Sequence, residues 1–264
     1  MYDFNYHRPA KVADAAALLK KAKEAKLMSG GMTLIPTLKQ RLASPSDIID
    51  LGALKNSGIK ATASKITIQA GTPHAEVAND KEVKSKIPAL AALAGGIGDP
   101  HVRNRGTIGG SISNNDPAAD YPSALVALGA TVVTNARKIE AEKFFTGMFE
   151  TALKRDEIVT AVEFPVPKKA GYSKFPNPAS RYAMVGVFVA DHGNGNVRVA
   201  VTGAGPCVFR HKGFEKALGT KFSADSLAGV STPAANLNSD MHASAEYRAH
   251  LVGVMAKRAV QAAK

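Results

Sequence analysis

The sequence predicts an α+β protein with two domains, and three observations support this. The chain has 264 residues, and domains average about 150 residues. Segments with apolar residues at helical spacing recur between segments that alternate at period two. Residues 165–178 hold four prolines and interrupt these patterns as a linker would. We therefore expect a larger N-terminal region and a smaller C-terminal region that meet near Pro167.

The N-terminal region contains two expected helices and four expected strands. In residues 12–26, Val12, Ala16 and Leu19 fall on one helical face among good helix formers. Pro88 stands at a first-turn position, where proline is tolerated, and opens a second helix. That helix is expected to cover residues 88–94, and the strands to cover residues 48–51, 66–70, 131–134 and 157–165.

The C-terminal region is expected to hold a β-hairpin and a long helix. Residues 183–191 and 197–203 are rich in β-formers, and Asn194-Gly195 between them is a strong hairpin signal. Residues 246–264 place apolar side chains on one side of an amphipathic helix.

Composition and charge restrict the classes of protein that the chain can belong to. Hydrophobic residues make up 45% and charged residues 21%, as in soluble globular proteins. No run of 18 apolar residues and no apolar stretch behind a basic N-terminus occurs, so we expect no transmembrane segment, no secretory signal and a cytoplasmic location. The net charge is +12, yet no run of five basic residues occurs. A solvated basic surface is therefore favoured over a nucleic-acid-binding module, and we expect no nucleic-acid partner.

The chain has a single cysteine, Cys207, which limits its redox chemistry. One cysteine forms no internal disulfide, and an iron–sulfur cluster normally needs four thiolates. Any redox chemistry must therefore come from an organic cofactor or from a partner chain. Cys207 itself is expected to be a small packed residue.

Two Gly-Gly pairs are the first features that could bind a ligand. Gly30-Gly31 is followed by Thr33, and Gly109-Gly110 lies between Thr107 and Ser111. Glycine permits positive φ, so successive backbone N–H groups can converge on one anion such as a diphosphate. The alternative is that both pairs are ordinary tight turns. Neither fits the dinucleotide-binding G-x-G-x-x-G pattern or the P-loop, so hydride transfer on a Rossmann domain has no support.

Other polar residues near the second pair leave alternatives open. Asp120 could accept hydrogen bonds from sugar or ribityl hydroxyls, or it could be a helix N-terminal carboxylate favoured by the helix dipole. Arg103 and Arg105 could pair with phosphate or with acids of a partner subunit. The seven histidines form no metal-spaced cluster and are expected on the surface or in turns.

Two motifs then make the chain resemble a known family. Residues 97–122 read IGDPHVRNRGTIGGSISNNDPAADYP, and residues 27–42 read LMSGGMTLIPTLKQRL. In these motifs the chain resembles the FAD-binding medium subunit of molybdenum hydroxylases, of the aerobic carbon monoxide dehydrogenase type, related to the flavin domain of xanthine dehydrogenase. The resemblance covers essentially the whole chain.

The resemblance implies a fold and a set of cofactor-binding residues. The fold would be a two-subdomain FAD-binding domain of the vanillyl-alcohol-oxidase (PCMH) type over residues 1–167, with subdomains of about 1–55 and 56–167. A smaller α+β flavoprotein C-terminal domain would cover residues 168–264. The residues implied to contact FAD are Leu27, Met28, Ser29, Gly30, Gly31, Met32, Thr33, Leu34, Ile97, Thr107, Ile108, Gly109, Gly110, Ser111, Asp120, Val159 and Tyr182.

The resemblance also implies a function and partners. A large subunit with the molybdenum cofactor would oxidise the substrate, and a small subunit would pass electrons through [2Fe–2S] clusters to FAD on this chain and on to an external acceptor. The three chains would form a heterotrimer that can dimerise. No side chain of this chain need act as a catalytic acid or base. The alternative is a stand-alone flavin-dependent oxidase or dehydrogenase of the same fold.

The chain departs from the family pattern at four places. Ser29 replaces the usual alanine, Met32 replaces a small or polar residue, and Ser111 replaces an asparagine or aspartate. Some relatives have a lysine near Pro176 that contacts FAD, whereas this chain reads Phe175-Pro176-Asn177. We expect these changes to retune the site and not to remove it.

Overall fold

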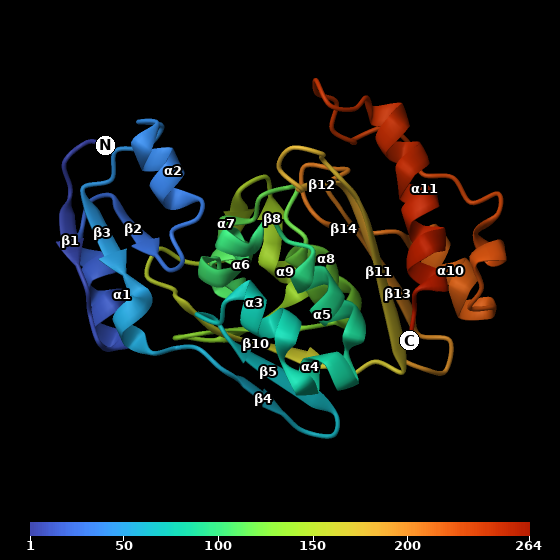
Figure 1. The fold of residues 1–264 in the computed structure, drawn as a ribbon, viewed down its shortest axis with the longest axis horizontal. Coiled ribbons are helices and arrows are strands. Elements are labelled where there is room, and N and C mark those ends of the chain that lie inside the picture. Colours follow the sequence, from blue (N-terminus) through green and yellow to red (C-terminus); the bar gives the residue numbers. More distant parts are fainter.

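A computed structural model describes residues 1–264 and arranges three regions along one axis. The N-terminal region is a small parallel sheet in the order β1-β3-β2, with two helices (Figure 1, blue). Its core contains Ala15, Leu19 and Ile49. The elements are β1 (Asn5–His7), α1 (Val12–Lys21), β2 (Ala25–Met28), α2 (Leu34–Lys39), β3 (Asp47–Asp50) and η1 (Leu51–Leu54).

The central region is an antiparallel five-stranded sheet in the order β4-β5-β10-β6-β7. Ile66 and Ile68 of β5 are fully buried, as the period-two pattern predicts. The strands are β4 (Ile59–Ala61), β5 (Lys65–Gln69), β6 (Thr131–Thr134), β7 (Lys138–Glu140) and β10 (Val159–Pro165), and a hairpin adds β8 (Phe145–Gly147) and β9 (Glu150–Thr151). The helices, several of which lie above the sheet in Figure 1, are α3 (His74–Asn79), α4 (Lys81–Lys86), α5 (Pro88–Gly95), α6 (Pro100–Arg105), α7 (Ile108–Asn114), α8 (Tyr121–Leu128) and α9 (Ala141–Phe144).

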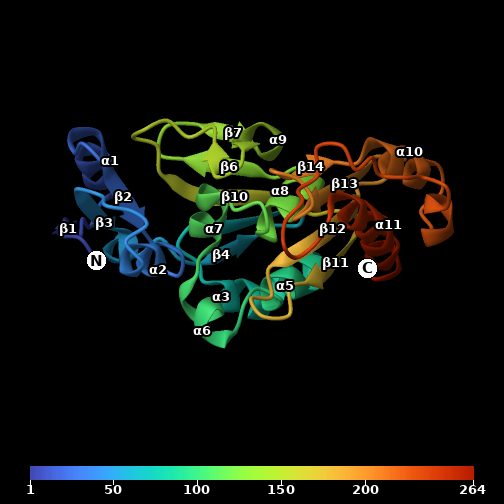
Figure 2. The ribbon, with the colours of Figure 1, turned by 90° about the horizontal axis from the view of Figure 1, so that it is seen from above.

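The C-terminal region is an antiparallel sheet in the order β11-β12-β13-β14. Every residue of β12 is buried, because α8 of the central region and α11 both pack on this sheet. Figure 2 shows the N-terminal and C-terminal sheets at opposite ends of the molecule. The elements are β11 (Lys169–Pro176), β12 (Ala183–Asp191), β13 (Val197–Thr202), β14 (Phe209–Arg210), α10 (Lys212–Thr220), η2 (Ala224–Leu227) and α11 (Ala245–Gln261).

The first helix ends earlier than its sequence pattern predicts. It stops at Lys21, and Ala22 has extended backbone angles. The expected last turns are instead the parallel strand β2, which pairs with β3. Pairing with a strand about 20 residues away overrides the local helix propensity of this lysine-rich and alanine-rich segment.

The expected linker at residues 165–178 is also wrong. Most of it is strand β11, which pairs with β12 along its whole length. Pro165 and Pro176 stand at strand ends, where the missing N–H does little harm to the ladder. Only residues 166–168 connect the central sheet to the C-terminal sheet.

The glycine-rich stretch at residues 98–111 is more regular than its turn-like composition suggests. Asp99 caps α6 by accepting from the N–H of Val102, and Pro100 opens that helix. Thr107 caps α7 by accepting from the N–H of Gly110. The second Gly-Gly pair therefore lies in the first turn of a helix and not in a loop.

Candidate functional site

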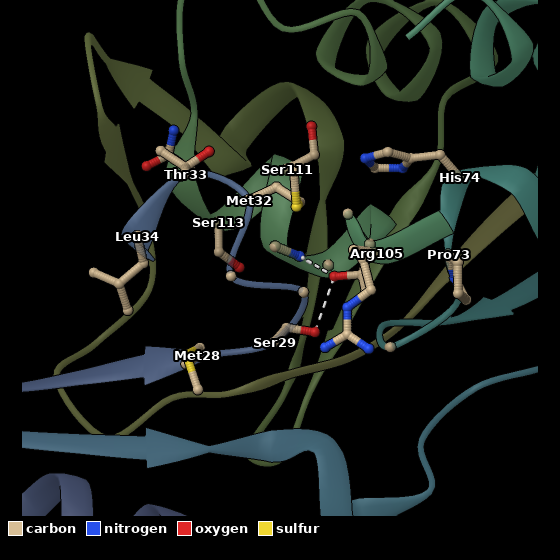
Figure 3. A pocket seen from close by; sticks show the side chains of 18 of the residues that line it. Met28, Ser29, Met32, Thr33, Leu34, Pro73, His74, Arg105, Ser111 and Ser113 are labelled. Atoms are coloured by element: carbon tan, nitrogen blue, oxygen red, sulfur yellow. Dashed lines mark hydrogen bonds between the residues drawn. The ribbon is translucent and has the colours of Figure 1, made fainter. Parts of the chain in front are cut away.

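The two Gly-Gly segments meet in space although they lie about 80 residues apart in the sequence. The hydroxyls of Ser29 and Thr107 share a hydrogen bond of 3.0 Å (Figure 3). A Cβ on Gly30 would stand 1.9 Å from the carbonyl oxygen of Arg105, so the two backbones are in direct contact. We call residues 29–34 the first bend and residues 106–111 the second bend.

The first bend presents unpaired backbone donors. None of the N–H groups of residues 29–34 donates a hydrogen bond within the chain. Gly31 has φ of +74°, the left-handed conformation that glycine adopts without strain. A series of free N–H groups around such a turn forms a concavity that suits an anion.

The second bend uses its N–H groups internally. Ile108 donates to the carbonyl of Thr72, Gly109 to that of Ala70, and Ser111 to that of Thr107. Gly110 donates to the Thr107 hydroxyl, so only the N–H of Thr107 itself is free. The expectation that amides of both pairs converge on one anion is therefore wrong for this bend.

The glycines of the second bend serve packing instead. A Cβ on Gly109 would stand 2.6 Å from the Cβ of Ala70 and 2.7 Å from its carbonyl oxygen. Helix α7 can approach the end of β5 this closely only because residue 109 has no side chain. Ile108 is fully buried in the central core and does not reach the site, contrary to its predicted role.

A cavity of about 790 Å³ opens between the two bends. This volume lies within the range of small-molecule and cofactor sites. All the sequence-predicted residues except Ile108 line it: Leu27, Met28, Ser29, Gly30, Gly31, Met32, Thr33, Leu34, Ile97, Thr107, Gly109, Gly110, Ser111, Asp120, Val159 and Tyr182. The cavity thus joins residues from all three regions of the molecule.

Asp120 combines features of both roles that the sequence left open. It precedes α8, yet its side chain accepts no N–H of that helix. Its Oδ1 instead pairs with Lys174 Nζ at 2.9 Å and accepts from the Tyr172 hydroxyl. Burial raises the pKa of Asp120, and the Lys174 charge opposes that rise. Oδ2 has no partner within the chain, so the carboxylate can accept from a ligand hydroxyl.

Lys174 supplies the lysine that the sequence seemed to lack near Pro176. Besides Asp120, its ammonium donates to the carbonyls of Gly96 and Arg181, at 2.9 and 3.0 Å. It therefore ties β11 to the end of α5 and to the turn that carries Tyr182.

The two arginines beside the second bend differ in role. Arg103 donates to the carbonyls of Ile97 and Gly98, at 3.0 and 2.9 Å, so it fixes the chain there and does not face the cavity, contrary to its predicted contact with phosphate. Arg105 lines the cavity and forms no ion pair within the chain. Only Arg105 is therefore placed to attract an anion.

Sequence reasoning missed His74 as a residue of the site. It was expected on the surface or in a turn, but it is 4% exposed, begins α3 and lines the cavity. Burial, with a smaller effect of Arg103, lowers the pKa of His74 to about 4. No motif could have revealed it, because its position depends on the pairing of Pro73 with Thr107.

Asp116 and Tyr182 line the part of the cavity wall near Asp120. Burial raises the pKa of both side chains, and the Asp116 and Asp120 charges add to the rise at Tyr182. No group of three or more His, Cys, Asp or Glu side chains in the chain is arranged to hold a metal ion. The longest helices are too short or too polar to cross a membrane.

The cavity fits a dinucleotide cofactor such as FAD. The first bend offers free N–H groups to a diphosphate, Asp120 offers a carboxylate oxygen to a hydroxyl, and Ile97 and Val159 offer apolar surface to a ring. A Cβ on Gly30 or Gly109 would close the walls on each other. Fold and site together define the class of nucleotide-cofactor-binding α+β proteins.

Comparison with known proteins then gives the family. Residues 2–167 match the FAD binding domain in molybdopterin dehydrogenase, and residues 170–263 match the CO dehydrogenase flavoprotein C-terminal domain. The chain belongs to this family of FAD-binding oxidoreductase subunits, in agreement with the sequence resemblance.

Relatives align with the chain over nearly its whole length. It is 35% identical to the nicotine 6-hydroxylase medium subunit of Paenarthrobacter nicotinovorans, over 97% of this chain and 95% of the relative. It is 33% identical to the carbon monoxide dehydrogenase medium chain of Hydrogenophaga pseudoflava, over 98% and 96%. A solved structure, the reconstituted CO dehydrogenase from Oligotropha carboxidovorans, superposes with a TM-score of 0.89 at 30% identity, over 98% of this chain and 97% of that chain.

Proposed function

We propose that this chain is the FAD-carrying electron-transfer subunit of a molybdenum hydroxylase. It would accept electrons from the [2Fe–2S] clusters of a small partner subunit and pass them to an external acceptor, while a large molybdenum subunit oxidises the substrate. The observation that carries the proposal is the first bend, whose unpaired N–H groups face a cavity of cofactor size. The relatives, named as medium subunits or medium chains, support it.

FAD supplies the redox chemistry when it is bound, and the chain supplies binding and orientation. The N–H groups of residues 29–34 would hold the diphosphate, with the free N–H of Thr107 beside them. Asp120 would accept from a ribityl or ribose hydroxyl, and Lys174 holds that carboxylate in place. Ile97, Val159 and Tyr182 would pack against the rings, which keeps water from the site.

The proposed assembly follows from what the chain contains. Its one cysteine provides too few thiolates for a cluster, so the clusters would belong to a partner. The names of the relatives carry different substrates, among them nicotine, carbon monoxide and glyceraldehyde. This variety suits a subunit that handles electrons while another subunit chooses the substrate.

We also propose a division into an FAD-binding domain, residues 1–167, and a C-terminal domain, residues 168–264. The subdomains of the first would be about 1–55 and 56–167. The separate parallel and antiparallel sheets support this division, as do the ranges of the two family matches.

The test is to purify the chain, add FAD and measure flavin absorbance and melting temperature. We expect bound flavin and a rise in melting temperature, because a ligand that binds only the native state stabilises it. Isolation from the native host should then yield a complex that contains molybdenum and iron. A chain that carries flavin but purifies alone and oxidises a substrate unaided would support the stand-alone oxidase instead.

A further inference from the structure

His74 stands out among the titratable side chains of the cavity wall. It is 4% exposed, yet its side chain has no hydrogen-bond partner within the chain, and its Nδ1 is fully buried. A buried polar atom without a partner costs free energy, so such atoms are rare unless a ligand or water satisfies them. Figure 3 shows the ring pointing from Pro73 into the cavity.

The other ring nitrogen borders the space between the two bends. Nε2 lies 2.7 Å from the place that a Cβ would take on Gly106. The next residue, Thr107, has the free N–H of the second bend and shares a hydroxyl bond with Ser29. Arg105, on the other side of Gly106, lines the same cavity without an ion pair. Donors and positive charge thus surround this space, as an anion requires.

A second unpartnered polar atom lies behind His74. The hydroxyl of Tyr121 is fully buried and has no partner, and the two rings are 5.4 Å apart between centroids. A small rotation, or one buried water, would let this hydroxyl donate to Nδ1. That bond would leave the imidazole proton on Nε2, where it faces the cavity.

We propose that His74 donates a hydrogen bond through Nε2 to the diphosphate of the bound cofactor, and that Tyr121 is the positioning residue that fixes its tautomer. This inference rests on the proposed function, because it assigns a further residue to the same site. It adds a side-chain donor to the backbone donors of the first bend.

Charge gives the contact a pH dependence. At pH 7 the imidazole is neutral, because burial and Arg103 lower its pKa to about 4. The groups that face or surround it are Arg103, Arg105 and Tyr121, with the Asp116 and Asp120 carboxylates in the same cavity. A diphosphate opposite Nε2 would raise the pKa of His74, so binding would take up a proton. Affinity for the cofactor should therefore increase as the pH falls from 7 toward 5.

The experiment measures binding of FAD and of ADP, which carries the diphosphate without the flavin, to the full chain. His74→Leu and His74→Asn should weaken both ligands about tenfold, since they remove the donor at Nε2. His74→Gln should stay within about threefold of wild type, because its amide can reach the place of Nε2. The affinity gain between pH 7 and 5 should be smaller in His74→Gln.

A second measurement needs no substitution at the site. The ¹⁵N signals of His74 should show the Nε2–H tautomer in wild type and should shift when ADP is added. In Tyr121→Phe the tautomer preference should weaken, which a purely structural role of the hydroxyl would not cause. These signals test the contact even where the leucine or asparagine variant fails to fold.

The outcomes separate the two levels of the proposal. A wild-type chain that binds neither FAD nor ADP contradicts the proposed function itself. A wild-type chain that binds both, with His74→Leu equal to it and with unmoved ¹⁵N signals, contradicts only the role of His74. Loss of melting temperature in the ligand-free variants, with unchanged affinity, would reduce His74 to a structural residue and would likewise overturn the inference.

Discussion

The first and second bends contain the same Gly-Gly pair and use it in opposite ways. At the first bend the N–H groups of residues 29–34 stay unpaired, and Gly31 provides the left-handed turn. At the second bend the N–H groups of residues 108–111 bond within the chain, and Gly109 allows a helix to touch a strand. The difference teaches that a glycine pair identifies a close approach of backbones, but not whether its amides are available to a ligand.

The largest expected effect is at Gly109, where the comparison predicts a loss of stability. In Gly109→Ala the new Cβ would stand 2.6 Å from Ala70 Cβ and 2.7 Å from a backbone oxygen that cannot move away easily. Overpacking of this kind costs about 3 kcal/mol. Urea unfolding of the ligand-free chain measures it. A variant as stable as wild type would show that the second bend is not a packing device.

Gly31→Ala should instead reduce affinity. Alanine is strained at φ of +74°, and its Cβ would approach Ile35 Cδ1 at 2.7 Å, a side-chain atom that can shift. We expect the free N–H groups to turn away from one another and FAD to bind about tenfold more weakly, a loss of about 1.4 kcal/mol. Titration of flavin fluorescence measures the affinity. If Gly31→Ala lost stability and kept full affinity, the contrast between the bends would fail.

Thr107→Val tests the connection between the bends. It removes both the cap of α7 and the hydroxyl bond to Ser29. Loss of an N-cap costs about 1 kcal/mol, which urea unfolding should show. Thr107→Ser keeps the hydroxyl and is the matched control, so it should retain most of that stability. Equal losses in both variants would indicate that the methyl group, and not the cap, matters.

Gly253→Ala is the smallest expected effect and calibrates the others. Gly253 lies in α11, and a Cβ there would meet no atom within 4 Å. Alanine is the better helix former, so stability should rise by up to about 1 kcal/mol with FAD affinity unchanged. Thermal unfolding and flavin titration together check both halves. A destabilised variant would mean that glycine substitutions here report more than local packing.

The sequence predicts those parts of the fold whose signals are local. The alternation at Ile66 and Ile68, the Asn194-Gly195 hairpin and the amphipathic C-terminal helix all appear in the structure. Signals that depend on distant partners are lost. Strand β2 forms because β3 lies beside it, and α7 forms despite two glycines because Thr107 caps it.

The same limit applies to the site. The cavity lining is foreseen for the residues that stand in recognisable motifs, such as Gly30 and Asp120. Whether an N–H is free cannot be predicted, since the acceptors of the second bend, Ala70 and Thr72, lie nearly 40 residues earlier. His74 has no motif at all and reaches the cavity through tertiary pairing.

The packing of α8 against β12 has a consequence for how the molecule unfolds. The large central core includes Ala170, Phe188, Ala190 and Ala200 from the C-terminal sheet, so one apolar interior crosses the boundary between the two family matches. A fragment cut at that boundary would expose this surface to water. The chain should therefore melt in calorimetry as a single cooperative unit, with its halves distinct in ancestry but not in thermodynamics.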